Sequence, residues 1–503
     1  MELKAYQEKI LSDQSRWSAR VEIPLEAELM IPDYHPPVFK MVKTLVEPVI
    51  LQKHGAAGRL ILEGYLRCEI FYQSEGENQL CQVEQKCSFS RTIELPQGTV
   101  EDGLIQIWGK PEYINCRATH PRRLELRGGY ELTVESPVYQ EVEILTGLAQ
   151  GEGEQKLCRT QTMAYLPCGD KVITAEEEII LEEAPKSVVE IRGSIPVKEI
   201  KKAQGKALIK AMVQGEIYYR GEQNQELRKQ EFSFPVRQVM DLEAMEEDTI
   251  CQGWASPLGW SLQEGEEKSV RLSVTAMVGL RAWHTKQCVL LSDAFFPGWE
   301  TQSVETQLRL EQMEKEFSEE LTLDLEWEEE SAAQVLAVMA QIHPPKPEAV
   351  EDMTEMAGQG MVWWFYKNQQ EEIQCREQPF RYTLPGRWMG EPEDWLAADS
   401  AQVIQTSGML NGRKLEAELK IQVSGVLFHT PLCNALVSLE RGEPKQRDPD
   451  SPALTIYYAL PGESVFQIAK TFGAAPAQLM ACNNLEEDEI QSPVKLLVPQ
   501  RLE

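Results

Sequence analysis

Residues of the kinds that carry catalysis or hold metal ions are sparse and scattered in this chain. The sequence has no Gly-x-Ser-x-Gly elbow, no phosphate-binding loop and no His-Glu-x-x-His motif. A run of carboxylates such as Glu176-Glu177-Glu178 is typical of a solvated strand or loop in an acidic chain. The histidines are widely separated, at His35, His54, His120, His284, His343 and His429. We therefore expect no catalytic residue, no metal site and no cofactor, and predict that the protein is not an enzyme; a hydrolase in the body of the chain is the least favoured alternative.

The cysteines also argue against a metal or disulfide framework. Their number is 11, which is odd, and they are spread from Cys68 to Cys482 without a Cys-x-x-Cys pair. Reduced, mostly buried thiols in a cytosolic protein are the expectation.

Charge and length limit the classes of partner. The chain has 503 residues, enough for several domains, and a formal net charge of −30 from 80 acidic and 50 basic residues. This charge repels phosphate backbones and anionic lipids, so neither nucleic acid nor a membrane is an expected partner. The first residues, Met1 to Lys4, do not resemble an export signal, and no apolar run is long enough to span a membrane. We expect a cytoplasmic protein.

One sequence segment recurs along the chain, and its copies account for the organisation of most of the sequence. Leu60 to Leu95 is echoed in Ala207 to Leu242, and a weaker copy begins at Gly358. The anchor tyrosines Tyr72, Tyr219 and Tyr366 are equally spaced, because 219 − 72 and 366 − 219 are both 147. Equal spacing predicts three tandem copies of one domain. These tyrosines are either core residues, which we favour, or a repeated binding patch.

Within each copy, apolar and polar residues alternate around a polar turn, which indicates a β-hairpin. Strand-rich repeats of this size are typical of β-sandwiches, so we predict a mainly β protein with three tandem β-sandwich-like units and a small C-terminal domain. The charged, proline-rich run from Arg441 to Pro452 predicts a flexible linker. The predicted division is an N-terminal helix over 1–18, unit 1 over 19–170, unit 2 over 171–304, unit 3 over 305–440, a linker over 441–452 and a terminal domain over 453–501.

The terminal domain carries the signals of two short helices between two strands. Ser464 is a good N-cap with Gln467 three residues later, and Gly473 ends this first helix. The second helix begins at Pro476 and ends at Asn483-Asn484, because asparagine tolerates the left-handed conformation. In the first helix the side chains expected to pack on the sheet are Val465, Ile468, Ala469 and Phe472. The predicted order is β-α-α-β.

This domain resembles the LysM family, a small β-α-α-β fold best known for binding N-acetylglucosamine-containing glycans. The matching residues are Tyr457, Pro461-Gly462-Glu463-Ser464, Ile468-Ala469, Phe472, Leu479, Asn483, Leu485 and Val498-Pro499. The family's binding loops correspond here to Pro461, Gly462, Glu463 and Ser464 and to Asn483, Asn484, Leu485 and Glu486. A purely structural role for Gly462, Ser464 and Asn483 in turning and capping is the alternative.

The repeated body resembles the SPOCS domain of spore-envelope proteins. The resemblance rests on Ile31-Pro32-Asp33, Pro36-Pro37, Glu69-Ile70-Phe71-Tyr72, Ser88-Phe89 and Ser292-Asp293-Ala294-Phe295. SPOCS units followed by one C-terminal LysM domain are the arrangement of the SipL-like family of spore morphogenesis proteins. This resemblance implies a non-enzymatic scaffold in the mother-cell cytoplasm that docks on the forespore surface, helps to attach other coat proteins, and binds the coat-basement ATPase through its LysM domain. The third unit, with Trp363-Trp364, departs most from the SPOCS pattern.

Two leucines favour a protein over a sugar as the partner of the terminal domain. Leu460 and Leu497 stand where LysM domains often carry polar residues, and a two-stranded sheet with both helices on one side would leave them facing water. Exposed apolar residues on a small domain indicate a protein contact. The alternative is a protein whose LysM domain binds peptidoglycan, but that polymer lies outside the cytosolic membrane.

Overall fold

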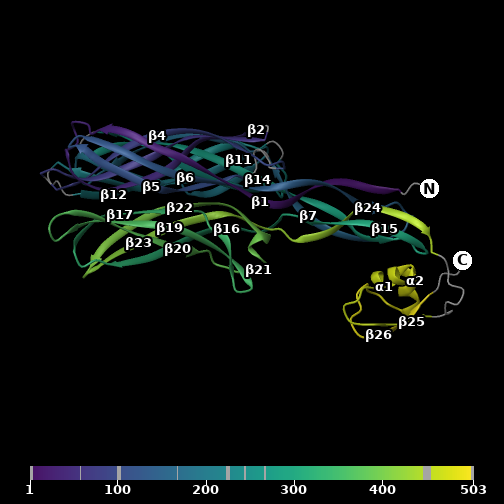
Figure 1. Ribbon diagram of the computed structural model, residues 1–503. Helices are drawn as coiled ribbons and strands as arrows, with labels where there is room; N and C mark the ends of the chain where they lie inside the picture. Colours follow the sequence, from purple (N-terminus) through teal and green to yellow (C-terminus); the bar gives the residue numbers. More distant parts are fainter. Residues whose placement is uncertain are drawn as a thin grey trace.

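The computed structural model is built almost entirely of antiparallel β-strands (Figure 1). It describes residues 4–56, 58–76, 78–98, 104–166, 168–222, 227–242, 245–265, 268–445 and 455–499. Three β-sandwich-like units form the body, a narrow stalk of ribbons extends from one end, and a small module lies against that stalk. The predicted fold class is confirmed.

Unit 1 contains two three-stranded sheets, with strand orders β1-β6-β5 and β2-β3-β4. In the first half of β3, Leu60 and Leu62 are buried while Ile61 and Glu63 are exposed, which is the alternation of a strand with one face on a core. Apolar side chains from both sheets share that core. The strands are β1 (Ala5–Met30), β2 (Val38–Ala56), β3 (Arg59–Ser74), β4 (Leu80–Glu94), β5 (Gln106–His120) and β6 (Arg123–Leu148).

Unit 2 repeats this plan with more, shorter strands. One sheet pairs β11 with β9, β10 and β12, and the other pairs β14 with β7, β8 and β13. A single apolar core again lies between the sheets. The strands are β7 (Glu154–Leu166), β8 (Asp170–Ile180), β9 (Pro185–Ser194), β10 (Val197–Ala203), β11 (Lys206–Gly221), β12 (Leu227–Asp241), β13 (Ile250–Glu264) and β14 (Ser269–Phe295).

Unit 3 has the sheet β16-β23-β22 and a second sheet in which β19 pairs with β17, β18, β20 and β21. Trp364 lies at the centre of the core between them. The elements are β15 (Trp299–Arg309), β16 (Gln312–Glu328), β17 (Ala332–Ile342), β18 (Lys346–Val350), β19 (Met353–Asn368), β20 (Ile373–Thr383), β21 (Trp388–Met389), the short 3-10 helix η1 (Pro392–Asp394), β22 (Trp395–Asn411), β23 (Lys414–His429) and β24 (Leu432–Pro444).

The central strands β3, β11 and β19 confirm that the three units are copies. Their first residues are 59, 206 and 353 and their last residues are 74, 221 and 368, so each differs from the next by 147. The anchor tyrosines Tyr72, Tyr219 and Tyr366 therefore occupy the same place on equivalent strands. All three are buried in the cores of their units, so the core interpretation holds.

The second halves of these central strands are buried on both faces. One face covers the core of its own unit, and the other meets the neighbouring units. Phe71, Tyr218 and Phe365, each one residue before an anchor tyrosine, join one apolar cluster at this junction. The rings of Phe71 and Phe365 lie 4.6 Å apart between centroids. The three units are thus packed into one body rather than strung along the chain.

The stalk consists of three two-stranded ribbons, one from each unit (Figure 1). Ribbon 1 pairs residues 5–13 with 139–148, ribbon 2 pairs residues 154–163 with 285–295, and ribbon 3 pairs β15 with β24. Apolar side chains from all three ribbons pack together, including Ile10, Leu290 and Leu308. This packing gives the ribbons a shared core, which an isolated two-stranded ribbon lacks.

The predicted N-terminal helix is wrong for the described residues. From Ala5 the chain forms one strand that pairs with β6 along its whole length, starting with Ala5 opposite Leu148. Ile10 is buried in the stalk, while its neighbours Lys9 and Leu11 are exposed. A partner strand and an apolar core outweigh the helical preference of a short segment.

The predicted unit boundaries also shift, because strand pairing groups the chain differently. Residues 154–166, assigned to unit 1, pair with β14 and belong to unit 2. Residues 299–304, assigned to unit 2, pair with β24 of unit 3. Residues 441–444 of the predicted linker continue β24, and residues 446–452 lie outside the described residues.

The C-terminal module has the predicted β-α-α-β order. It comprises β25 (Thr455–Ala459), α1 (Val465–Phe472), α2 (Pro476–Asn483) and β26 (Val494–Val498). Val465, Ile468 and Leu479 are buried between the helices and the sheet. Phe472 was expected in this core, but it is 41% exposed. Its ring makes an edge-to-face contact with the ring of Tyr457.

Candidate partner-binding surface

The outer face of the module's small sheet is apolar and open to solvent. β25 and β26 are antiparallel, with Ile456 opposite Leu497 and Tyr458 opposite Lys495. Leu460 is 61% exposed and Leu497 is 41% exposed, which confirms that both leucines face water. The helices cover only the other face of the sheet.

Ile456 and Tyr458 lie on the same surface, although neither was predicted from the sequence as a binding residue. They are 55% and 65% exposed and alternate along β25 with residues that face the core. Leu460 follows them on this face, about 13 Å from Ile456 at the usual rise along a strand. The four side chains Ile456, Tyr458, Leu460 and Leu497 therefore form one stripe, called here the apolar sheet face. The period-two alternation from Thr455 to Leu460 was the signal that could have revealed it.

The first predicted binding loop is held by its own hydrogen bonds. Pro461 and Gly462 are exposed, and Gly462 has a φ of 89°, which a glycine adopts without strain. The Glu463 carboxylate accepts hydrogen bonds from the Tyr457 hydroxyl and the Leu460 N–H, both at 2.7 Å. The bond from Tyr457 lowers the pKa of Glu463. Glu463 thus braces the turn.

Ser464 stands at the N-cap of α1, but its side chain does not cap the helix. Its hydroxyl donates to Asp488 Oδ2 at 2.7 Å, and Asp488 Oδ1 accepts the Phe466 N–H at 2.8 Å. Asp488 supplies the cap that the sequence attributed to Ser464 and Gln467. Sequence spacing did not reveal this, because the capping residue follows the helix instead of preceding it.

The second predicted binding loop is also held by hydrogen bonds within the module. The Asn483 amide donates to the carbonyls of Leu479 and Leu497, both at 2.8 Å, and accepts the Leu497 N–H at 2.6 Å. Asn484 has a φ of 53° and ends α2 as predicted. Leu485 is half-buried, and Glu486 is exposed. The first loop is bonded to Ile490 and bridged to Glu489, so it meets the segment beyond the second loop.

Replacement of Asn483 by Ala is expected to lower the stability of the module by about 1–3 kcal/mol, because three side-chain hydrogen bonds are lost, two of which join α2 to β26. Hydrogen exchange of the Leu497 amide in the full-length protein measures the change. Glu486→Ala, at an exposed neighbouring position, is the control and should leave that exchange rate unchanged. Unchanged exchange in Asn483→Ala would contradict the structural role.

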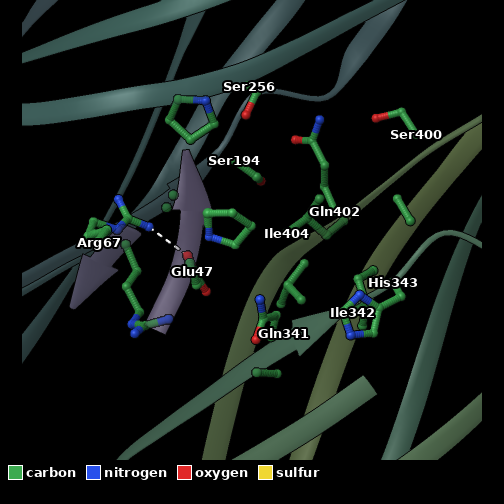
Figure 2. A pocket seen from close by; sticks show the side chains of 18 of the residues that line it. Glu47, Arg67, Ser194, Ser256, Gln341, Ile342, His343, Ser400, Gln402 and Ile404 are labelled. Carbon is green, nitrogen blue, oxygen red and sulfur yellow. Dashed lines mark hydrogen bonds and ion pairs between the residues drawn. The ribbon is translucent and has the colours of Figure 1, made fainter. Parts of the chain in front are cut away.

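Apart from this surface, a cavity lies where the three units meet (Figure 2). Its volume is about 370 Å³, and its wall includes Glu47 and Arg67 of unit 1, Ser194 of unit 2, and His343 and Gln402 of unit 3. Figure 2 shows the hydrogen-bonded ion pair between Arg67 and Glu47, whose N–O distance is 2.8 Å. Sequence reasoning did not find this cavity, because its wall comes from segments more than 300 residues apart.

The cavity wall contains one polar side chain that joins two units and two titratable groups with shifted pKa values. The Gln402 amide accepts the Ile195 N–H and donates to the Ala255 carbonyl, both at 2.8 Å, which links unit 3 to unit 2. Burial acts to raise the pKa of Glu47, but the guanidinium groups of Arg67 and Arg192 outweigh it and hold that pKa below its usual value. Burial, helped by the Lys346 charge, lowers the pKa of His343 and favours its neutral form. The Gln402 hydrogen bonds thus make this part of the cavity wall a junction between units 2 and 3.

Among the residues that the structure describes, no group of three or more His, Cys, Asp or Glu side chains is arranged to hold a metal ion. None of the helices in the described ranges is both long and apolar enough to cross a membrane.

The fold and this surface define a multi-unit β-sandwich protein with an appended module that exposes an apolar face. Comparison with family models finds the SipL, SPOCS domain at residues 37–119 and 185–257. The two matches cover corresponding strands of units 1 and 2, from β2 to β5 and from β9 into β13. Units 1 and 2 thus each carry a SipL-type SPOCS domain, and in these units the chain is similar to SipL-like proteins. No curated protein and no solved structure matches the chain.

The family indicates a sporulation-related role, and the SipL SPOCS family is not a known enzyme family. The matches lie in units 1 and 2, so unit 3 and the C-terminal module are characterised by their structure alone.

Proposed function

We propose that the protein is a non-enzymatic scaffold of spore-envelope morphogenesis. It works in the mother-cell cytoplasm at the forespore surface and tethers coat layers there. Its C-terminal module, which resembles a LysM domain, binds a partner protein, the coat-basement ATPase, and the body contacts other coat proteins. The observation that carries the proposal is the apolar sheet face, because four exposed apolar side chains in one stripe favour a protein contact.

The two loops that bind glycans in LysM domains support the same choice. Binding a sugar requires polar groups that are free to exchange hydrogen bonds with its hydroxyls. Here the amide of Asn483 and the side chains of Glu463 and Ser464 are already bonded within the module. Partner capture through the apolar sheet face uses none of them.

The variant Leu460→Lys/Leu497→Lys is expected to lose partner capture. Each leucine buried at an interface contributes on the order of 1.5–3 kcal/mol, so the pair weakens binding by roughly 10²- to 10⁴-fold. The measurement is pull-down of the coat-basement ATPase by full-length wild type and variant. The variant should remain folded, because exposed substitutions usually change stability by less than about 0.5 kcal/mol.

Met389→Lys is the matched control, since Met389 is 80% exposed but lies in unit 3. It should capture as much ATPase as wild type does. Equal capture by wild type and the double variant would refute the proposal. Tight binding of chitin oligomers, with no protein retained, would support the glycan alternative instead.

A further inference from the structure

The segment Ser292 to Phe295 at the end of β14 touches the C-terminal module. Its Asp293 is only 7% exposed, although the segment lies at the far end of the stalk. Asp293 Oδ2 accepts a hydrogen bond from Gln467 Nε2 at 2.8 Å, and Oδ1 lies 2.6 Å from Lys470 Nζ. Gln467 and Lys470 are one turn apart on α1, so one carboxylate binds one face of that helix. Gln467 thus contacts the stalk and takes no part in a capping box.

Apolar and charged contacts surround this carboxylate. The ring of Phe295 packs edge-on against Phe466 of α1, with centroids 5.3 Å apart. Phe295 and Phe466 are each less than a tenth exposed, and Phe295 joins the apolar core of the module itself. Lys156 of the same ribbon lies 3.5 Å from Asp488, the residue that caps α1. The two ion pairs have opposite polarity, which specifies one orientation of the module on the stalk.

We propose that Asp293, Phe295 and Lys156 form a docking site on the stalk for helix α1 of the C-terminal module. Figure 1 shows α1 and α2 between the stalk and the strands β25 and β26, so the docked module turns its apolar sheet face away from the stalk. Docking therefore leaves that face accessible and holds it at a set place on the body. This inference concerns the arrangement of the chain and does not depend on which partner binds.

The test measures how freely the module rotates in the full-length protein. Cys482 lies on α2 and is the exposed thiol of the described chain, so it takes a maleimide dye for time-resolved fluorescence anisotropy. In wild type the module should rotate with the whole protein. Asp293→Lys places a second cation beside Lys470. In this variant the anisotropy decay should gain a component with a several-fold shorter rotational correlation time. Asp293→Lys/Lys470→Asp restores opposite charges and should remove that component.

Asp324→Lys is the matched control, because Asp324 is an exposed acid on β16 in unit 3, and it should behave as wild type. Rescue by the double variant separates a lost contact from a damaged stalk. A fast component already present in wild type, or no change in Asp293→Lys, would overturn the proposal. Slow rotation accompanied by dimers in small-angle X-ray scattering would also overturn it, because the module would then dock on a second copy.

Discussion

Replacement of Arg192 by Met is expected to lower the stability of the junction between units 1 and 2 by about 3–5 kcal/mol, because a buried charge that loses its partner is strongly destabilising. Arg192 on β9 donates to Glu69 on β3, which is 2% exposed. Glu190 lies beside them and is 7% exposed. Burial, with the charge of Glu69, raises the pKa of Glu190 well above its usual value. Without Arg192 these carboxyl groups face one another with fewer cations.

The second cation of this network, Arg67, does not replace the first. Its Nε lies 3.3 Å from Glu69 Oε1, but its terminal nitrogen is already paired with Glu47. The local opening free energy, measured by hydrogen exchange of the β3 and β9 amides, follows the junction without assuming that the whole chain unfolds at once. Arg192→Lys keeps the positive charge and should lower the local opening free energy less than Arg192→Met does. Glu69→Gln/Arg192→Met removes both charges and should recover part of the loss.

A fall of less than about 1 kcal/mol in Arg192→Met, as for a solvent-exposed pair, would show that the network is solvated and does not hold the units together. Additive effects of Glu69→Gln and Arg192→Met would contradict their direct coupling in the same way.

Replacement of Trp364 by Ala is expected to destabilise unit 3 by about 3–5 kcal/mol through loss of buried apolar area and formation of a cavity. Trp364 is fully buried on β19 and lies in the core of unit 3. The corresponding positions, each 147 residues earlier, are Ile217 and Ile70, which are also fully buried. The same position is thus a core position in all three units, and unit 3 fills it with a larger side chain.

Hydrogen exchange resolved along the chain tests this prediction. Protection should fall in β19 and its partners β17 and β20 while β3 and β11 retain theirs. Trp364→Phe is the conservative variant. Because the indole Nε1 of Trp364 has no hydrogen-bond partner, this substitution removes side-chain volume but no hydrogen bond. Met389→Ala, at an exposed position of the same unit, is the control. A loss in Trp364→Ala no larger than that of the control would exclude Trp364 from the core.

Local patterns in the sequence were sufficient for several features of this protein. The spacing of Tyr72, Tyr219 and Tyr366 predicted three equivalent units, because a repeated domain keeps its core residues at a repeated distance. The β-α-α-β order of the module and the left-handed ends at Gly473 and Asn484 were likewise predictable. These features depend on residues that lie within about one helical turn of each other in the sequence. The exposure of Leu460 and Leu497 followed from a two-stranded sheet with helices on one face.

Other features depended on contacts between distant residues, and these required the tertiary structure. Ala5 becomes part of a strand because Leu148 lies opposite, and β7 belongs to unit 2 because it pairs with the end of β14. Asp293 and Lys470 are 177 residues apart in sequence. Short-range propensities contribute tenths of a kcal/mol per residue, whereas burial of one apolar side chain contributes about 1.5–3 kcal/mol, and loss of one partner of a buried ion pair costs about 3–5 kcal/mol. The sequence by itself therefore determined the repeated units and the order of their elements, and tertiary packing decided how the ribbons, the units and the module are joined.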